Sequence, residues 1–138
     1  MKRFVKNWDT FVNKIQVTSG NPFGYIAATA AYKHGAQWLS EVKDIIYGNY
    51  LYLKETLEKE LPEIKVYPLE GTYLIWIDFG SYVKGDELVD FLQNKCRIAL
   101  DYGEWFGGEH FATFGRMNLA TSRENVETAV KAIIENLK

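Results

Sequence analysis

The hydrophobic positions in the first third of the chain recur at helical spacing. Residues 4–16 carry an apolar side chain every three or four positions, and the stretch VTSGNP then ends the pattern with glycine and proline. Residues 23–32 (FGYIAATAAY) are small, apolar and rich in alanine, which predicts a second helix, closely packed and buried, that stops at His34 and Gly35. The chain is therefore expected to begin with two short helices.

A long amphipathic helix is predicted next. Between residues 39 and 61, hydrophobic side chains recur three or four apart, with acidic residues and lysines between them, and Pro62 ends the pattern. This helix and segment 23–32 carry more apolar surface than a small sheet can cover. Both are therefore expected to pack against another domain or subunit.

The hydrophobic period then changes to that of strands. The runs 64–67 and 72–78 are rich in β-branched and aromatic residues and are joined through Pro68 and Gly71, which predicts an antiparallel pair. The strand period returns later in the chain, so further strands are expected to extend this sheet.

The C-terminal half alternates between the two periods. A helix is expected to open at Gly85 and Asp86, and a short buried strand is expected at 97–100 (RIAL). The glycine-rich loop DYGEWFGGEH separates that strand from another, ATFGRMNLA. Two more strands are therefore predicted for the sheet.

A final helix follows Thr121 and Glu124, which are spaced as a capping box. Its apolar residues fall on one face: Val126, Val130, Ile133 and Leu137. The whole order of elements predicts an α/β (α+β) fold, with a small mixed or antiparallel sheet of about four strands covered by helices on one side, and a long connecting helix.

Composition limits the partners and the compartment. At 138 residues, 47% of them hydrophobic, the chain can bury the core of one ordinary domain. Its 16 basic and 18 acidic residues leave no excess of positive charge to hold nucleic acid. A single cysteine, no apolar run of the signal-peptide kind and no membrane-spanning segment predict a soluble, cytoplasmic protein.

Short motifs in the chain do not predict a site of their own. The DFG triplet that begins at Asp78 lacks the companion motifs of a kinase. His34 and His110 have no further ligand at metal-binding spacing, so no metal site is expected. Cys96 precedes a predicted buried strand, and core packing is its expected role.

Arg116 is the residue that most needs an explanation. It lies in a predicted strand, where alternation places it on the same face as Phe114 and opposite Met117. One interpretation is an exposed arginine or a structural salt bridge, for instance with Asp78 or Glu109. The other is a fork that binds a ligand carboxylate in two parallel hydrogen bonds, beside the aromatic loop. The residue pattern alone leaves both open.

The longest patterns in the chain resemble a known family. The strings GTYLIWIDF and RIALDYGEWFGGEHFATFGRMNLATSRENVETAVKAI resemble the C-terminal part of fold-type-I pyridoxal-phosphate enzymes of aminotransferase class I and II. The DxGxWFGG loop paired with RxNLATxR is most similar to C–S β-lyases of the MalY/PatB cystathionine β-lyase type. SGNPFGYIAATAAYKHGAQWLSEVKDIIYGNYLYL also resembles the helix that leads into the family's small domain, so the similarity covers nearly the whole chain.

The resemblance implies roles for four residues. Arg116 matches the arginine that binds the substrate α-carboxylate, so that the Cα proton is oriented toward the catalytic base. Trp105 and Phe106 match the loop over the active-site mouth and are expected to contact substrate. Asn21 matches a residue near the cofactor site of the neighbouring subunit.

The resemblance also implies which groups this chain does not supply. The family needs a lysine that forms a Schiff base with pyridoxal phosphate, an aspartate for the pyridine nitrogen and an aromatic ring stacker. No lysine here lies in the matching setting, so no catalytic residue and no bound cofactor are expected in this chain, which is expected to be inactive alone. Residues 1–35 would be helices left from the large-domain junction, and residues 36–138 would form the small domain with its connecting helix.

Three functions follow as hypotheses. The first is the small domain of a homodimeric, pyridoxal-phosphate-dependent C–S β-lyase that acts on cystathionine or a related amino acid. The second is the same domain of a transaminase. The third is a non-catalytic module that binds amino acids or a protein partner.

Overall fold

The computed structural model describes residues 2–15 and 20–138. The chain divides into two compact units, one up to Ser40 and the other from Glu41 to Lys138. The sequence-based domain boundary between residues 35 and 36 stays a prediction.

The first unit contains α1 (Lys2–Lys14) and α2 (Pro22–His34). The predicted helix 4–16 thus ends two residues early, and residue 16 lies outside the described residues. Asn21 caps α2, because its side-chain oxygen accepts a hydrogen bond from the Gly24 amide at 3.1 Å. Pro22 occupies the first turn of the helix, where no amide hydrogen is required.

The prediction that the alanine-rich helix is buried is wrong for this chain. Every residue of α2 is exposed, including Phe23 at 82% and Tyr32 at 93%. Small apolar side chains permit close packing but do not by themselves bury a helix. Within the described residues, no second surface covers the helix.

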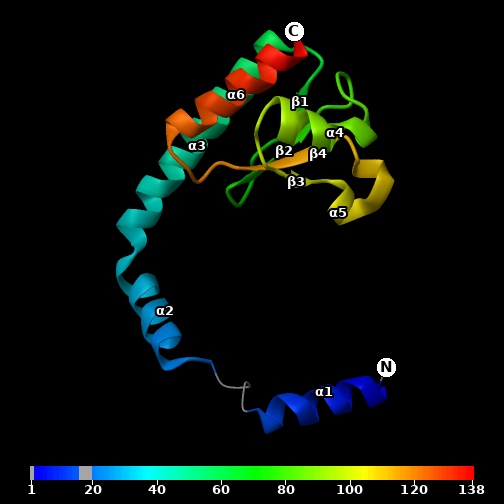
Figure 1. Cartoon of the computed structure of the whole chain (residues 1–138). Helices are drawn as coiled ribbons and strands as arrows, with labels where there is room; N and C mark the ends of the chain where they lie inside the picture. The colour runs from blue at the N-terminus through cyan, green and yellow to red at the C-terminus, as the bar shows by residue number, and fades with distance from the viewer. Residues whose placement is uncertain (1, 16–19) are drawn as a thin grey trace. The chain divides into compact units, whose positions relative to one another are not determined.

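Helix α3 (Ala36–Glu60) is the long helix that the sequence predicts, and it ends immediately before Leu61 and Pro62. Its buried residues all lie in the second unit: Asn49, Tyr50, Leu53 and Leu57. The final helix, α6 (Arg123–Leu137), runs alongside this part of α3 (Figure 1), and Lys138 at its end pairs with Glu60. Together they form a helical layer.

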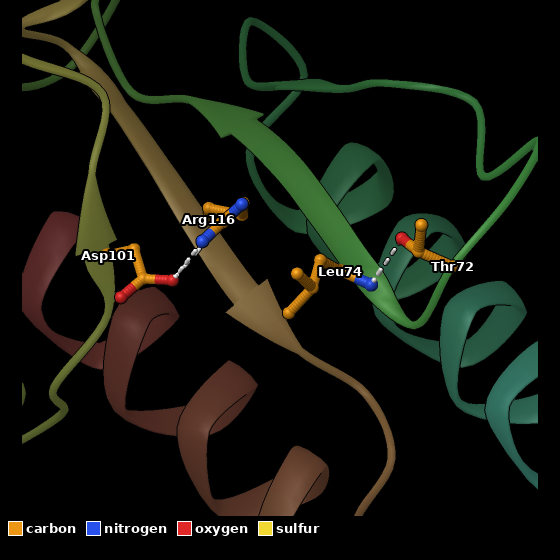
Figure 2. A network of polar contacts seen from close by, with 4 residues as sticks. All are labelled: Thr72, Leu74, Asp101 and Arg116. Atoms are coloured by element: carbon orange, nitrogen blue, oxygen red, sulfur yellow. Dashed lines mark hydrogen bonds and ion pairs between the residues drawn. The ribbon is translucent and has the colours of Figure 1, made fainter. Parts of the chain in front are cut away.

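The second unit is built on a four-stranded antiparallel sheet. Its strand order is β1 (Lys65–Val66), β2 (Leu74–Asp78), β4 (Phe114–Asn118) and β3 (Asp101–Tyr102). The predicted antiparallel pair and the strand that contains Arg116 are confirmed. At the start of β2, Thr72 Oγ1 accepts a hydrogen bond from the Leu74 amide at 3.1 Å (Figure 2).

Alternation along the strands separates a core face from an open face. Ile75 and Ile77 of β2 and Met117 of β4 are buried on the core face. They join the buried residues of α3 and α6 in one hydrophobic cluster, together with Leu88 and Leu92 of the short helical segment α4 (Leu88–Asp90) and its continuation η2 (Phe91–Lys95). Helices therefore cover this face, as predicted.

The predicted strand at 97–100 is wrong. Arg97 has a φ of 58°, which takes the chain out of the extended conformation, and pairing with β4 begins only at Asp101. The predicted loop that follows supplies β3 instead, and then two short helical turns, α5 (Glu104–Gly107) and η3 (Gly108–Phe111).

The cap of α6 differs from the predicted one by a single residue. Ser122, not Thr121, is the N-cap, and its hydroxyl accepts from the Asn125 amide at 3.4 Å. The Thr121 carbonyl is already bound by Asn49, which holds that residue in the loop before the helix. Glu124 lies in the first turn of α6, where its charge suits the helix dipole.

Among the helices in the described part of the chain, none combines the length and apolar character needed to cross a membrane.

Candidate functional site

Arg116 lies at the middle of β4, on the open face of the sheet. Its cross-strand neighbours are Trp76 on β2 and Asp101 on β3. The open face is opposite the one that α3, α4 and α6 cover, and Phe114 shares it with Arg116, as the alternation predicts. The sheet therefore presents a cation beside aromatic side chains.

An ion pair joins Arg116 to Asp101. Nη2 and Nε of Arg116 both donate to Oδ2 of Asp101, at 2.7 and 3.1 Å. Figure 2 shows the two side chains reaching toward each other from neighbouring strands. The partners considered from the sequence are wrong: Asp78 instead accepts from Thr113 Oγ1 at 2.8 Å and from the Gly80 amide at 2.9 Å.

The exposure of this pair decides what it can do. The Arg116 side chain is 25% exposed and that of Asp101 is 43% exposed. A pair that remains in contact with water adds little to the stability of the fold, because solvent screens the attraction. The guanidinium is therefore not sealed inside the protein and can meet an anion from solution.

Two aromatic rings support the guanidinium. The Cζ atom of Arg116 lies 4.4 Å from the ring centroid of Phe106 and 5.7 Å from that of Trp76. These rings meet edge to face, with centroids 5.4 Å apart. Cation–π attraction and the fixed rings restrict the positions that the guanidinium can take.

Beside Arg116 the open face contains a cavity of about 360 Å³, which we call the aromatic pocket. Its walls are Tyr67, Trp76, Gly103, Phe106, Gly107, Phe111 and Phe114. None of these lining residues carries a charge, so the pocket suits an apolar group while Arg116 suits an anion.

The structure brings together only part of the predicted site. Phe106 lies against Arg116 and lines the aromatic pocket. Trp105, its neighbour in sequence, is 66% exposed and packs edge-on against Tyr102, with centroids 5.2 Å apart. Asn21 belongs to the other unit and is engaged as the cap of α2. The binding roles of all four residues stay predictions.

Two residues of the site were missed in the sequence. The strand expected at 97–100 stops before Asp101, so the sequence places this residue in the following loop and not in β3. Trp76 is the other: it lies between Ile75 and Ile77 in the strand, and alternation assigns it to the open face. Strand alternation was the signal that could have found Trp76.

The residues at this site do not fit a covalently held pyridoxal phosphate. Among the described residues, no lysine lines the aromatic pocket, and none of its lining residues carries a positive charge for a phosphate. Lys54, on α3, is bound to Glu58 and to the Val66 carbonyl. No reaction step can therefore be derived through that cofactor from this chain's residues.

Other reactive groups do not form a second centre. Within the described residues, no three potential metal-ligating side chains gather. Burial raises the pKa of the Cys96 thiol to about 11, so the thiol stays protonated and unreactive near neutral pH. This agrees with the predicted core role of Cys96, which is 5% exposed.

A close approach at Gly103 shapes the aromatic pocket. A methyl group there would lie 2.3 Å from the Phe111 carbonyl oxygen and 2.7 Å from Phe114 Cβ. We expect Gly103→Ala to lower the free energy of unfolding by about 1–3 kcal/mol in urea denaturation. Gly71→Ala is the control, because a Cβ at Gly71 meets no atom within 4 Å. Equal denaturation midpoints for the two variants would show that the backbone around Gly103 accommodates a methyl group without loss of stability.

Comparison with known proteins finds characterised sequences that are similar to most of this chain. The chain is 34% identical over 110 residues to a cystathionine β-lyase of Corynebacterium glutamicum, covering 80% of this chain and 29% of that protein. It is 33% identical over 116 residues to cystathionine β-lyase PatB of Bacillus subtilis, covering 82% of this chain and 29% of that protein. No protein-family model matches the chain.

A solved structure supports the same relationship. Cystalysin of Treponema denticola, which contains pyridoxal 5′-phosphate, superposes with a TM-score of 0.80 at 32% identity. The match covers 94% of this chain and 34% of cystalysin. The chain spans about 29% of the length of the two curated relatives above.

Proposed function

Since this chain is homologous to cystathionine β-lyases of the PatB and MalY type, we propose that it is the carboxylate-binding domain of a pyridoxal-phosphate-dependent C–S β-lyase. Such an enzyme cleaves the bond between Cβ and sulfur in cystathionine or a related cysteine conjugate. The part played by this chain is to bind and orient the amino acid.

The placement of Arg116 is the observation that carries this proposal. An arginine on the open face of a sheet, partly exposed and supported by Phe106, presents a planar fork of N–H donors that matches a carboxylate. Two parallel hydrogen bonds fix the direction of the carboxylate as well as its position. The bonds at Cα are then oriented for proton removal by a group outside this chain.

The aromatic loop supplies the other contacts in the proposal. Phe106 is assigned to the wall beside the bound carboxylate, and Trp105 to the rim of the site, where its large exposed fraction leaves it free to touch substrate. Asn21 is assigned to the vicinity of the cofactor in a neighbouring subunit. Its engagement as a helix cap would hold the start of α2 in a fixed form there.

The exposed apolar side chains of α2 support an assembly larger than this chain. Phe23, Tyr25, Ile26 and Tyr32 are all more than half exposed. Apolar surface of this kind is usually covered in the functional state of a protein. In the proposal, this segment packs against the remaining part of the enzyme or a second copy in a homodimer.

The isolated chain is expected to have no lyase activity and to form no specific Schiff base. Among the described residues, no lysine lines the aromatic pocket beside Arg116, where a Schiff base with the cofactor would be needed. The chain is incubated with pyridoxal phosphate, reduced with borohydride and desalted. We expect the folded chain to carry no more lysine-bound pyridoxyl group than the chain unfolded in urea. Reduction at one lysine with full occupancy, in the folded chain only, would contradict this assignment of the lysines.

A non-catalytic amino-acid-binding module is the alternative from another class. Calorimetric titration of the isolated chain with L-cystathionine separates the two. Submillimolar, saturable binding that Arg116→Ala abolishes would favour the binding module. The lyase proposal expects at most weak binding, because the rest of the substrate site lies outside the chain.

A further inference from the structure

The ion pair between Asp101 and Arg116 uses only one edge of the guanidinium. Asp101 Oδ2 accepts from both Nε and Nη2, which together form the side edge. A guanidinium has a second edge, formed by Nη1 and Nη2, that can also hold a carboxylate in a fork. Within the part of the chain that the structure describes, no hydrogen bond occupies Nη1.

Aromatic rings restrict the guanidinium of Arg116, in addition to the ion pair at its side edge. The ring of Phe106 lies at 4.4 Å and the ring of Trp76 at 5.7 Å. Asp101 itself is held by the backbone, because it pairs directly with Arg116 in the register of β3 and β4. Three groups thus limit the motion of the side chain, and within the described residues the end edge is the part without a hydrogen bond at Nη1.

We propose that Asp101 is a positioning residue, which holds Arg116 by its side edge so that the end edge faces the substrate carboxylate. The identity of that carboxylate rests on the proposed function, whereas the positioning does not. A guanidinium that is already ordered loses less side-chain freedom on binding, so binding is stronger than for a mobile arginine.

A competing role for Asp101 makes the opposite prediction. If Asp101 stood in for the substrate and had to be displaced, its removal would strengthen anion binding. The contact geometry argues against this, because a stand-in for a bidentate carboxylate would accept two parallel hydrogen bonds, one on each of its oxygens. Asp101 instead meets the side edge with a single oxygen.

Three variants separate these roles. Asp101→Asn keeps a side-chain oxygen that can accept from both Nε and Nη2, whereas Asp101→Ala removes the acceptor. Asp90→Asn is the control, since Asp90 is an exposed aspartate that also accepts a side-chain hydrogen bond, from Asn94 at 2.7 Å. Both positions, Asp101 and Asp90, are solvent-accessible enough that the fold should persist, which urea denaturation checks.

The first measurement is nitrogen-15 NMR of the arginine side chains in the 138-residue chain. We expect slow rotation and separate Nη signals for Arg116 in the unchanged protein, in Asp101→Asn and in Asp90→Asn. In Asp101→Ala the signals should merge. Unaltered Arg116 signals in Asp101→Ala would overturn the positioning role whatever the function of the protein.

The second measurement is steady-state kinetics with L-cystathionine in the full-length enzyme that carries this domain. Asp101→Ala should raise KM about tenfold with kcat nearly unchanged, the pattern for loss of uniform binding, and Asp101→Asn should restore most of the loss. If Asp101→Ala and Asp101→Asn both have a KM below that of the parent, Asp101 competes with the substrate carboxylate for Arg116. If Arg116→Ala has no effect on kinetics while the NMR result stands, the proposed function fails and the positioning survives.

Discussion

Replacing Arg116 by alanine is expected to lower kcat/KM for L-cystathionine by about 10- to 150-fold in the full-length enzyme. The variant removes charge-assisted hydrogen bonds to the substrate carboxylate, which contribute about 1.5–3 kcal/mol. Arg116→Lys should recover part of the activity, because it restores the positive charge without the planar fork. The measurement is steady-state kinetics on variants whose thermal unfolding matches that of the parent.

Two controls make the Arg116 result specific. Lys95→Ala removes an exposed cation from the same unit and should leave kcat/KM unchanged. A substrate analogue with a carboxamide in place of the α-carboxylate should be used equally poorly by the parent and by Arg116→Ala. Normal kinetics in Arg116→Ala would remove this residue from the substrate site and leave its ion pair with Asp101 as its whole role.

Replacing Asn49 by alanine is expected to cost about 2–4 kcal/mol of unfolding free energy. Asn49 is 1% exposed, and its side-chain amide donates to the carbonyl oxygens of Leu119 and Thr121, at 3.0 and 2.9 Å. Its removal leaves two carbonyls without their donor and opens a small void. Urea denaturation of the 138-residue chain measures the loss.

Asn136→Ala is the matched control for Asn49. Asn136 also donates its side-chain amide to a backbone carbonyl, that of Ala132 at 2.8 Å, but it does so at the surface, where water replaces the bond. Its loss should stay within about 0.5 kcal/mol. Similar losses for the two variants would mean that the contacts of Asn49 do not hold the segment between β4 and α6 to α3.

Hydrophobic spacing was sufficient where the local pattern is long and the burial strong. The helix α3, the strand pair β1–β2 and the final helix α6 follow from spacing, because each places one continuous apolar face on a common core. The same alternation assigned Arg116 to the face opposite Met117. The sequence therefore predicts the types of these elements and the face of the sheet on which Arg116 lies.

Spacing failed where an unusual backbone conformation or a contact distant in sequence decides the structure. RIAL has the composition of a strand, yet the left-handed conformation of Arg97 delays pairing until Asp101. Thr121 and Glu124 have the spacing of a capping box, yet Asn49, 72 residues away, binds the Thr121 carbonyl and Ser122 becomes the cap. Neither the backbone conformation of Arg97 nor the hydrogen bond from Asn49 can be predicted from a short stretch of sequence.

By itself, the sequence determined the class of fold, the order of its main elements and an arginine placed on a strand near an aromatic loop. Only the tertiary structure decided that Asp101 is the partner of Arg116, that Phe106 and not Trp105 lies against the guanidinium, and which edge stays open. The physical reason is range: apolar periodicity acts between neighbours in the chain. The geometry around a charge depends instead on which strands become adjacent and in what register.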